Sequence, residues 1–317
     1  MNPTTETALP VPPDTGTTKP PDNRAAIKQA ALAIVYYGLF QACLPLIRIP
    51  AVRLPGFVLL LLVILPTMAF MFLQVRLALS IVSLRPSNKL CCLLAVAALG
   101  VLFLDTMASP LVYSAHNHTI LLALVLTQQV VHDISLTLAC TFFGILLSAI
   151  IRDKNTLLPV AFIAMPIDYL GAMTPIGFTN NMLKAHPGIV KAAAVSIPKL
   201  SGPHGISLSP IALIGPGDAL FMAFYFAVVV RLSLNTKETF WWMYWLLTAS
   251  MLAVLVIPWF YALAALVPMG VAVILANKNR FTLTRSEWFA FLYAGIFVLC
   301  LAVGFYLFSH AKLMGGH

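Results

Sequence analysis

Apolar stretches of about twenty residues recur along most of this chain, and they set the first limit on its fold. A helix needs roughly 20 predominantly apolar residues to cross a lipid bilayer. Hydrophobic residues make up 61% of the 317 residues, and charged residues only 9%. A water-soluble domain has no need for that much apolar sequence. We therefore expect an all-α protein, a polytopic transmembrane helical bundle of about nine helices, with eight to ten as the range.

The fourth apolar stretch, 119–151, leaves the helix number open. At 1.5 Å per residue it would make a helix of about 50 Å, which is long for one span. Gln128, Gln129, His132 and Asp133 fall in its middle, so it is either one tilted helix or two short helices that meet near Asp133. The expected helices are 26–47, 56–75 (with Arg76 at its end), 90–112, 119–151, 157–173, 218–234, 240–257, 262–276 and 288–308.

Two segments are not expected to form membrane helices. Residues 1–25 are rich in Thr and Pro and lack periodicity, which predicts a disordered N-terminal tail. Residues 175–210 contain several prolines, which oppose a continuous helix and predict a loop. The runs 189–197 and 206–214 in and beside that loop are compatible with β-strands.

The net charge of +9 comes largely from Lys and Arg between the apolar stretches. Such loop cations set membrane topology and contact anionic lipid headgroups, so the charge does not indicate nucleic-acid binding. If 119–151 is one helix, the pairs of Lys and Arg residues between the helices all fall on one side of the membrane. If it is two helices, this charge bias nearly vanishes, so the sequence leaves the orientation in the membrane open. No histidine or cysteine set has metal-ligand spacing, so neither a metal nor another cofactor is expected.

Asp168 and Asp218 carry the most specific functional signal. Each lies within or at the start of an expected membrane helix, where a charged carboxylate costs about 2.5–3.5 kcal/mol on insertion scales. Two close carboxyl groups cannot both ionise, so one can remove a proton from water while the other donates a hydrogen bond to a carbonyl. This pairing predicts peptide hydrolysis without a metal ion.

The residues before Asp218 suit such a site. Gly215 and Gly217 lack a Cβ, so an extended polypeptide backbone could approach closely. Pro216 restrains the turn, and Asp218 then lies at a helix N-terminus, where the helix dipole favours its charged form. A simple N-terminal capping role for Asp218 is the alternative interpretation of this string.

Three parts of the chain match the motifs of a known family: Ile167-Asp168-Tyr169, Gly215-Pro216-Gly217-Asp218 and the segment 262–268. On these residues the chain resembles the GxGD intramembrane aspartyl proteases, the family of presenilin, signal peptide peptidase and their microbial homologues. The segment 262–268 resembles a degenerate form of the third motif of that family, Pro-Ala-Leu-Pro. The resemblance covers about 160–277, and Ala264 and Val267 stand where prolines are expected in the third motif. Ile167 also replaces the usual Tyr before the first aspartate.

The resemblance implies an intramembrane aspartic endopeptidase that cleaves single-span membrane proteins or peptides without a cofactor. Asp168 and Asp218 would be the catalytic pair, with Gly215, Pro216, Gly217 and Tyr169 as motif residues of the cleft, flanked by Leu266 and Pro268. The chain would then divide into N-terminal helices (26–155), a presenilin-like catalytic region (156–277) and a last helix with a short tail (278–317). A bacterial or archaeal-type inner membrane is the expected location.

Three other functions are compatible with the sequence. A prepilin-type leader peptidase also uses a GxGD aspartate but cuts at the membrane surface. A proton-coupled transporter would use the same acids together with His132 and Asp133, which form the strongest rival site. A non-catalytic homologue would bind single membrane helices without cutting them.

Asp105 is another acidic residue in apolar sequence, and we expect it to form hydrogen bonds between helices.

Overall fold

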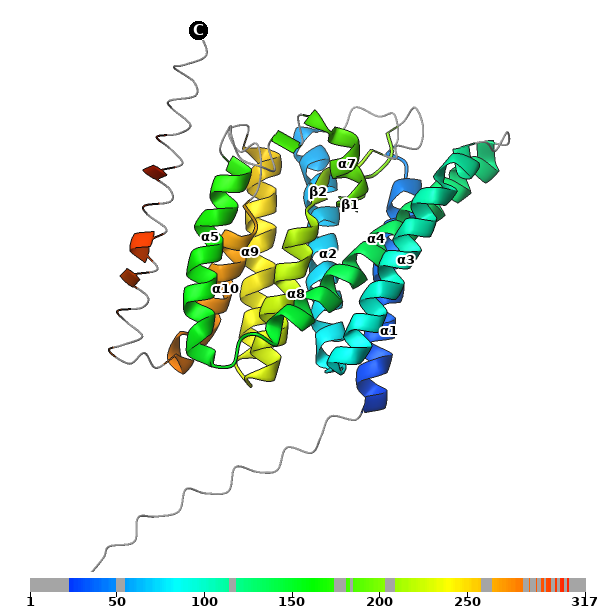
Figure 1. The fold of residues 1–317 in the computed structure, drawn as a ribbon. Coiled ribbons are helices and arrows are strands. Elements are labelled where there is room, and N and C mark those ends of the chain that lie inside the picture. Colours follow the sequence, from blue (N-terminus) through cyan, green and yellow to red (C-terminus); the bar gives the residue numbers. More distant parts are fainter. Residues whose placement is uncertain are drawn as a thin grey trace, which may run out of the picture.

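The structure is a computed structural model and describes residues 23–49, 55–113, 118–173, 181–182, 185–202 and 209–257, then 264–281 and scattered residues between 285 and 307. Over these residues the protein is a bundle of helices with one short β-hairpin (Figure 1). The expected tail 1–25 lies outside the described residues except for its last three, which begin the first helix. The expected helix 288–308 also lies largely outside them.

The helices agree with the all-α expectation. Six of them are long and apolar enough to cross a membrane, which identifies a multi-pass integral membrane protein. The others are shorter, and among these α8 is largely buried inside the bundle. The helices are α1 (Asn23–Cys43), α2 (Gly56–Ser83), α3 (Asn88–Tyr113), α4 (His118–Ser148), α5 (Leu157–Met173), α7 (Pro187–Ala192), α8 (Pro216–Arg231), α9 (Thr236–Val256) and α10 (Leu266–Asn277), with 3₁₀ turns η1 (Leu44–Leu46), η2 (Lys154–Thr156) and η3 (Lys278–Arg280).

The stretch 119–151 forms one continuous helix, α4, as far as Ser148, and the alternative of a turn near Asp133 is wrong. Asp133 has no exposed surface. The helix can continue through this acidic residue because its carboxylate accepts a hydrogen bond from another segment, as described below. With α4 unbroken, successive long helices run in alternate directions.

The basic turns consequently share one end of the bundle, which we call the basic end. It contains the α2–α3, α4–α5 and α8–α9 connections and the end of α10. The Arg231 guanidinium donates to the main-chain oxygen of Ile151 there, which joins the end of α8 to the end of α4. The hairpin and α7 lie at the opposite end (Figure 1).

Helix α8 packs against α4, α2 and α10. Gly144 allows α4 and α8 to come very close, since a Cβ at this position would lie 2.4 Å from the Leu220 oxygen. Outward-facing side chains of the long helices are mostly apolar, as expected where lipid replaces water. The polar and small residues are instead concentrated between helices.

Several helix boundaries differ from the sequence expectation. Helix α2 continues eight residues beyond 75, because Leu77, Ile81 and their neighbours remain apolar and are buried. Arg76 is therefore an exposed residue within α2 and does not lie at its end. Helix α8 begins two residues earlier than expected, with Pro216 at its first position, where proline needs no N–H partner.

The predicted β-compatible runs meet in an antiparallel hairpin. Strand β1 (Val195–Ile197) pairs with β2 (Ala212–Ile214), in the register Val195 with Ile214 and Ser196 with Leu213. The first half of the run 189–197 is part of α7, so the strand is shorter than expected. Because β2 ends at Ile214, the hairpin leads directly into Gly215-Pro216-Gly217-Asp218.

Candidate active site

Asp218 lies in the first turn of α8, and its carboxylate closes that turn. Its Oδ2 accepts a hydrogen bond of 3.2 Å from the N–H of Gly215, the residue that caps the helix. Capping thus accounts for one oxygen of this aspartate. A Cβ on Gly217 would meet no atom within 4 Å, so the backbone beside Asp218 faces open space.

Asp168 lies in α5 and is fixed by the beginning of α10. Its Oδ2 accepts a hydrogen bond of 2.9 Å from the N–H of Leu266. This N–H is one of the first-turn donors of α10, which have no partner inside the helix. The third sequence motif and the first aspartate, 98 positions apart, are therefore in direct contact.

The two aspartates lie at similar depths in the bundle. Asp168 is eleven residues beyond Leu157, where α5 begins at the basic end, and Asp218 is thirteen residues before Arg231, where α8 ends there. At 1.5 Å per residue these positions are about 16 and 20 Å from that end. The carboxyl groups are close enough to interact electrostatically, although no hydrogen bond joins these two described side chains.

The other predicted motif residues are divided between the interior and the surface. Leu266 and Pro268 are buried in α10. Gly270, two residues further on, allows close packing with α5, since a Cβ there would lie 3.0 Å from the Met165 side chain. Tyr169 is 52% exposed, so it follows Asp168 in sequence but faces outward.

Tyr225 is a residue of the site that the sequence reasoning missed. It lies seven positions after Asp218 on α8, which places both on one face of the helix. Its side chain is fully buried, and its hydroxyl has no hydrogen-bond partner among the described residues. Asp168 acts on this hydroxyl electrostatically. The seven-residue spacing was the only sequence signal that could have identified it.

His132 and Asp133, the predicted rival site, form a separate polar cluster. Asp133 Oδ1 accepts from the N–H of Ser196 on β1 at 3.2 Å and lies 3.4 Å from Nδ1 of His132. His132 Nε2 is 2.9 Å from the main-chain oxygen of Ala192. Gln41 of α1 donates to the Ser196 oxygen at 3.1 Å. These contacts hold β1 against α1 and α4.

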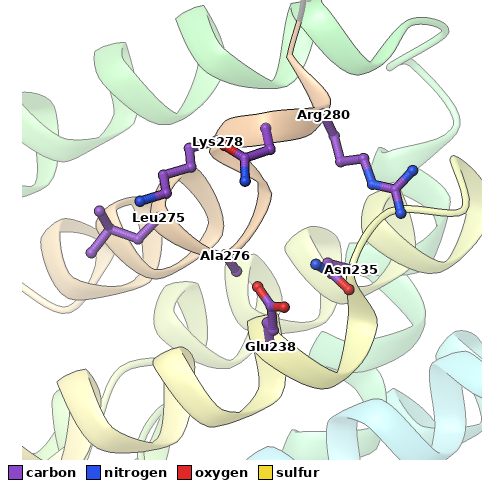
Figure 2. Close-up of a pocket in the computed structure, with 7 residues that line it drawn as sticks. Asn235, Glu238, Leu275, Ala276, Lys278 and Arg280 are labelled. Atoms are coloured by element: carbon purple, nitrogen blue, oxygen red, sulfur yellow. The ribbon is translucent and has the colours of Figure 1, made fainter.

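Two cavities of the described structure lie away from the aspartates, and neither is lined by Asp168 or Asp218. One, of about 700 Å³, lies between α3, α4, α7 and the hairpin. The other, of about 370 Å³, lies at the basic end between the beginning of α9 and the end of α10. Figure 2 shows Glu238, Lys278 and Arg280 around the second cavity. Lys278 and Arg280 in its lining suit contact with anionic lipid headgroups.

Asn277 stabilises the helix pair beside that second cavity. Its Oδ1 accepts from the N–H of Asn235 at 2.7 Å, and its Nδ2 donates to Thr239 at 3.0 Å. Both contacts tie α10 to the start of α9. This arrangement gives Asn277 a structural role.

No protein-family model, curated protein or solved structure matches this chain. The described residues also contain no group of three His, Cys, Asp or Glu side chains that could hold a metal ion. The family resemblance remains a prediction that rests on the matching residues.

Proposed function

We propose that the protein is an intramembrane aspartyl endopeptidase of the presenilin-like GxGD type. The observation that carries this proposal is the convergence of Asp168, Asp218 and the start of α10. Two carboxyl groups on different helices lie at similar depth, and a main-chain N–H orients each of them. Acidic residues within membrane helices are costly and are candidates for function.

The reaction requires one ionised and one protonated carboxyl group. The ionised group removes a proton from water as the water oxygen attacks the peptide carbonyl carbon. The protonated group donates a hydrogen bond to the carbonyl oxygen, which becomes an oxyanion. When the C–N bond breaks, the departing amine takes up a proton, so a carboxylic acid and an amine leave the site.

The hairpin offers a place for the substrate backbone. At β1, the N–H and carbonyl of Ser196 bond to Asp133 and Gln41. The outer edge of β1 is therefore occupied, and an added strand would join β2. Such strand addition uses main-chain hydrogen bonds to hold an extended polypeptide. It would place the polypeptide beside Gly217, where the structure is open.

The arrangement of basic turns supports an orientation. Cytoplasmic connections are enriched in Lys and Arg, so the basic end would face the cytoplasm. The aspartates would then lie towards the outer half of a bacterial or archaeal-type inner membrane. The substrate class is single-span membrane proteins or peptides.

The test is a cleavage assay in lipid bilayers with a panel of single-span substrates. Wild-type protein is expected to cleave at least one substrate, while Asp168→Asn and Asp218→Asn abolish cleavage. Asp153→Asn is a matched control, because it changes an exposed acid at the basic end. Each variant must retain the helix content and thermal unfolding of the wild type. Cleavage that survives both dyad changes would refute the catalytic pair.

A proton-coupled transporter is the second candidate, and the pair formed by His132 and the buried Asp133 favours it. Such a pair within a membrane helix is suited to proton transfer. If the protein is such a transporter, vesicles that contain it should take up solute in proportion to a pH gradient, and Asp133→Asn should abolish this uptake.

A prepilin-type peptidase is distinguished by cleavage of pilin-like precursors at the membrane surface. A non-catalytic homologue is distinguished by helix binding that both dyad variants retain.

A further inference from the structure

The 700 Å³ cavity beside the hairpin has the size of a ligand site and an unusual set of polar groups. Cavities of about 300–1,000 Å³ are typical of sites for small ligands. Leucine and valine side chains from α4 and β2 form part of its wall. Its polar lining includes Asp105, Thr106, Gln128, Gln129, His132 and Asp133.

Two carboxyl groups, those of Asp105 and Asp133, line this cavity, and His132 is the only described side chain of the lining that can carry a positive charge. No Lys or Arg of the described residues lines it. Asp105 is partly exposed, and its neighbour Gln128 donates to the Asp105 main-chain oxygen at 3.1 Å, not to its carboxylate. Asp133 is completely buried, and its Oδ2 has no hydrogen-bond partner in the described structure. A buried acceptor without a donor is costly and calls for a partner.

His132 does not supply a free positive charge to this cavity. Its Nε2 faces the carbonyl of Ala192, which can only accept, so Nε2 carries a hydrogen. Its Nδ1 faces Asp133 Oδ1 at 3.4 Å, so a proton also lies between these two atoms. The pair as a whole is neutral. Among the described residues of the lining, no positive charge is then left to balance the Asp105 carboxylate, and a group from outside could supply it.

The hairpin determines which group can enter. Ser196 and Leu213 are directly opposite each other, and both line the cavity, whereas Val195 and Ile214 are buried on the other face. A strand added to β2 would place one residue opposite Leu213. Side chains at directly opposite positions lie on the same face of a sheet, so that residue would point into the cavity.

We propose that this cavity is a subsite for a Lys or Arg side chain of the bound polypeptide. An ammonium or guanidinium group supplies both the positive charge and the donors that Asp105, Gln129 and Asp133 Oδ2 can accept. The apolar wall suits the aliphatic part of the same side chain. This subsite rests on the proposed function, because it requires strand addition at β2, and it adds a preference for a basic residue.

The test measures binding, which needs no cleavage. The probes are fluorescently labelled single-span peptides of Leu, Ala and Val. Each peptide of the series carries a single Lys at a different position. For every Lys peptide, two matched peptides carry Leu or Glu at the same position. Wild-type protein in phosphatidylglycerol nanodiscs is expected to bind one Lys register about tenfold more tightly than its Leu counterpart. Asp105→Asn should remove this preference, and Asp105→Lys should transfer it to Glu at the same position.

Two controls establish that a peptide side chain occupies the subsite. Asp153→Asn, at the basic end, should leave the Lys preference unchanged. If phosphatidylethanolamine or free butylamine occupies the cavity through Asp105 while the peptide residue has no effect, the cation belongs to the lipid or amine and the proposal is overturned. Equal binding of Lys and Leu peptides, or no binding of any peptide, also overturns it.

The same measurements separate this proposal from the protease proposal. A Lys preference that depends on Asp105 in a protein that cleaves nothing would leave the subsite standing and remove the protease. Cleavage that is indifferent to Lys at every position would remove the subsite alone. Asp105 is partly exposed, so its variants are expected to fold, and thermal unfolding of each variant checks this directly.

Discussion

The N–H of Leu266 donates a hydrogen bond of 2.9 Å to Oδ2 of Asp168, and this contact links two distant parts of the chain. Leu266 begins α10, so its N–H has no acceptor within its own helix. Asp168 supplies that acceptor from α5. The contact therefore caps α10 and fixes the orientation of a candidate catalytic carboxyl group at the same time.

A main-chain ester at Leu266 tests this contact directly. Replacing the residue with its α-hydroxy analogue removes the N–H but keeps the side chain. Hydrogen bonds to charged groups contribute about 1.5–3 kcal/mol, so we expect peptidase activity to fall roughly 10- to 100-fold. The same replacement at Met269, whose N–H bonds to Ala265 inside the helix, is the control. An equal loss of activity at both positions would show that Asp168 is not specifically affected.

Tyr225→Phe separates stability from activity. The Tyr225 hydroxyl is buried without a hydrogen-bond partner in the described structure. Its removal should raise the unfolding free energy by about 1 kcal/mol, because an unpaired buried hydroxyl is destabilising. We expect peptidase activity to fall about tenfold, since Asp168 acts on this hydroxyl electrostatically. Thermal unfolding and cleavage are measured on the same sample.

Tyr244→Phe is the control for that change. Tyr244 lies in α9, where its ring packs against Phe72 of α2 at a centroid distance of 5.6 Å. It is not part of the aspartate site, so its cleavage rate should match the wild type. Unchanged activity in Tyr225→Phe would remove Tyr225 from the proposed mechanism.

The sequence predicted the elements of the candidate site better than their contacts. Asp168 and Asp218 were identifiable because a carboxylate in apolar sequence is costly, and Gly215 and Gly217 because they mark a turn. The contact between Asp168 and Leu266 depends on how α5 packs against α10, which no local pattern encodes. The position of Tyr225 depends on the same packing.

Helix boundaries and the hairpin show the same limit. Arg76 interrupts the apolar run and so predicts a helix that ends at 75, yet one exposed arginine is compatible with the longer helix α2. The sequence alone does not decide between a turn and a continuous helix at Asp133, because the partner of this residue, Ser196, is 63 positions away. Strands of three residues are too short to be specified without their partner strand. The pairing of β1 with β2 depends on tertiary structure.

Gly144→Ala tests the close approach of α4 and α8. The added Cβ would lie 2.4 Å from the Leu220 oxygen and 2.8 Å from the Phe224 nitrogen. Both are backbone atoms, so the helices must separate, and we expect destabilisation by about 1–3 kcal/mol. Gly100→Ala in α3 is the matched control, because its Cβ would meet nothing within 4 Å. Thermal unfolding in detergent should show that the Gly100→Ala variant is as stable as the wild type or slightly more stable.

Asp133→Asn and Asp133→Leu test whether α4 holds the hairpin. Asn retains an oxygen that can accept the Ser196 N–H, whereas Leu leaves this buried N–H without a partner. We expect Leu to destabilise the protein by about 1–3 kcal/mol more than Asn does. Hydrogen–deuterium exchange should accelerate in 193–199 and 210–216 for the Leu variant, with little change in α9. Because β2 leads directly into Gly215, we expect the variant with faster exchange in both strands to cleave substrate more slowly. Equal exchange rates in the Asn and Leu variants would show that other contacts hold the hairpin.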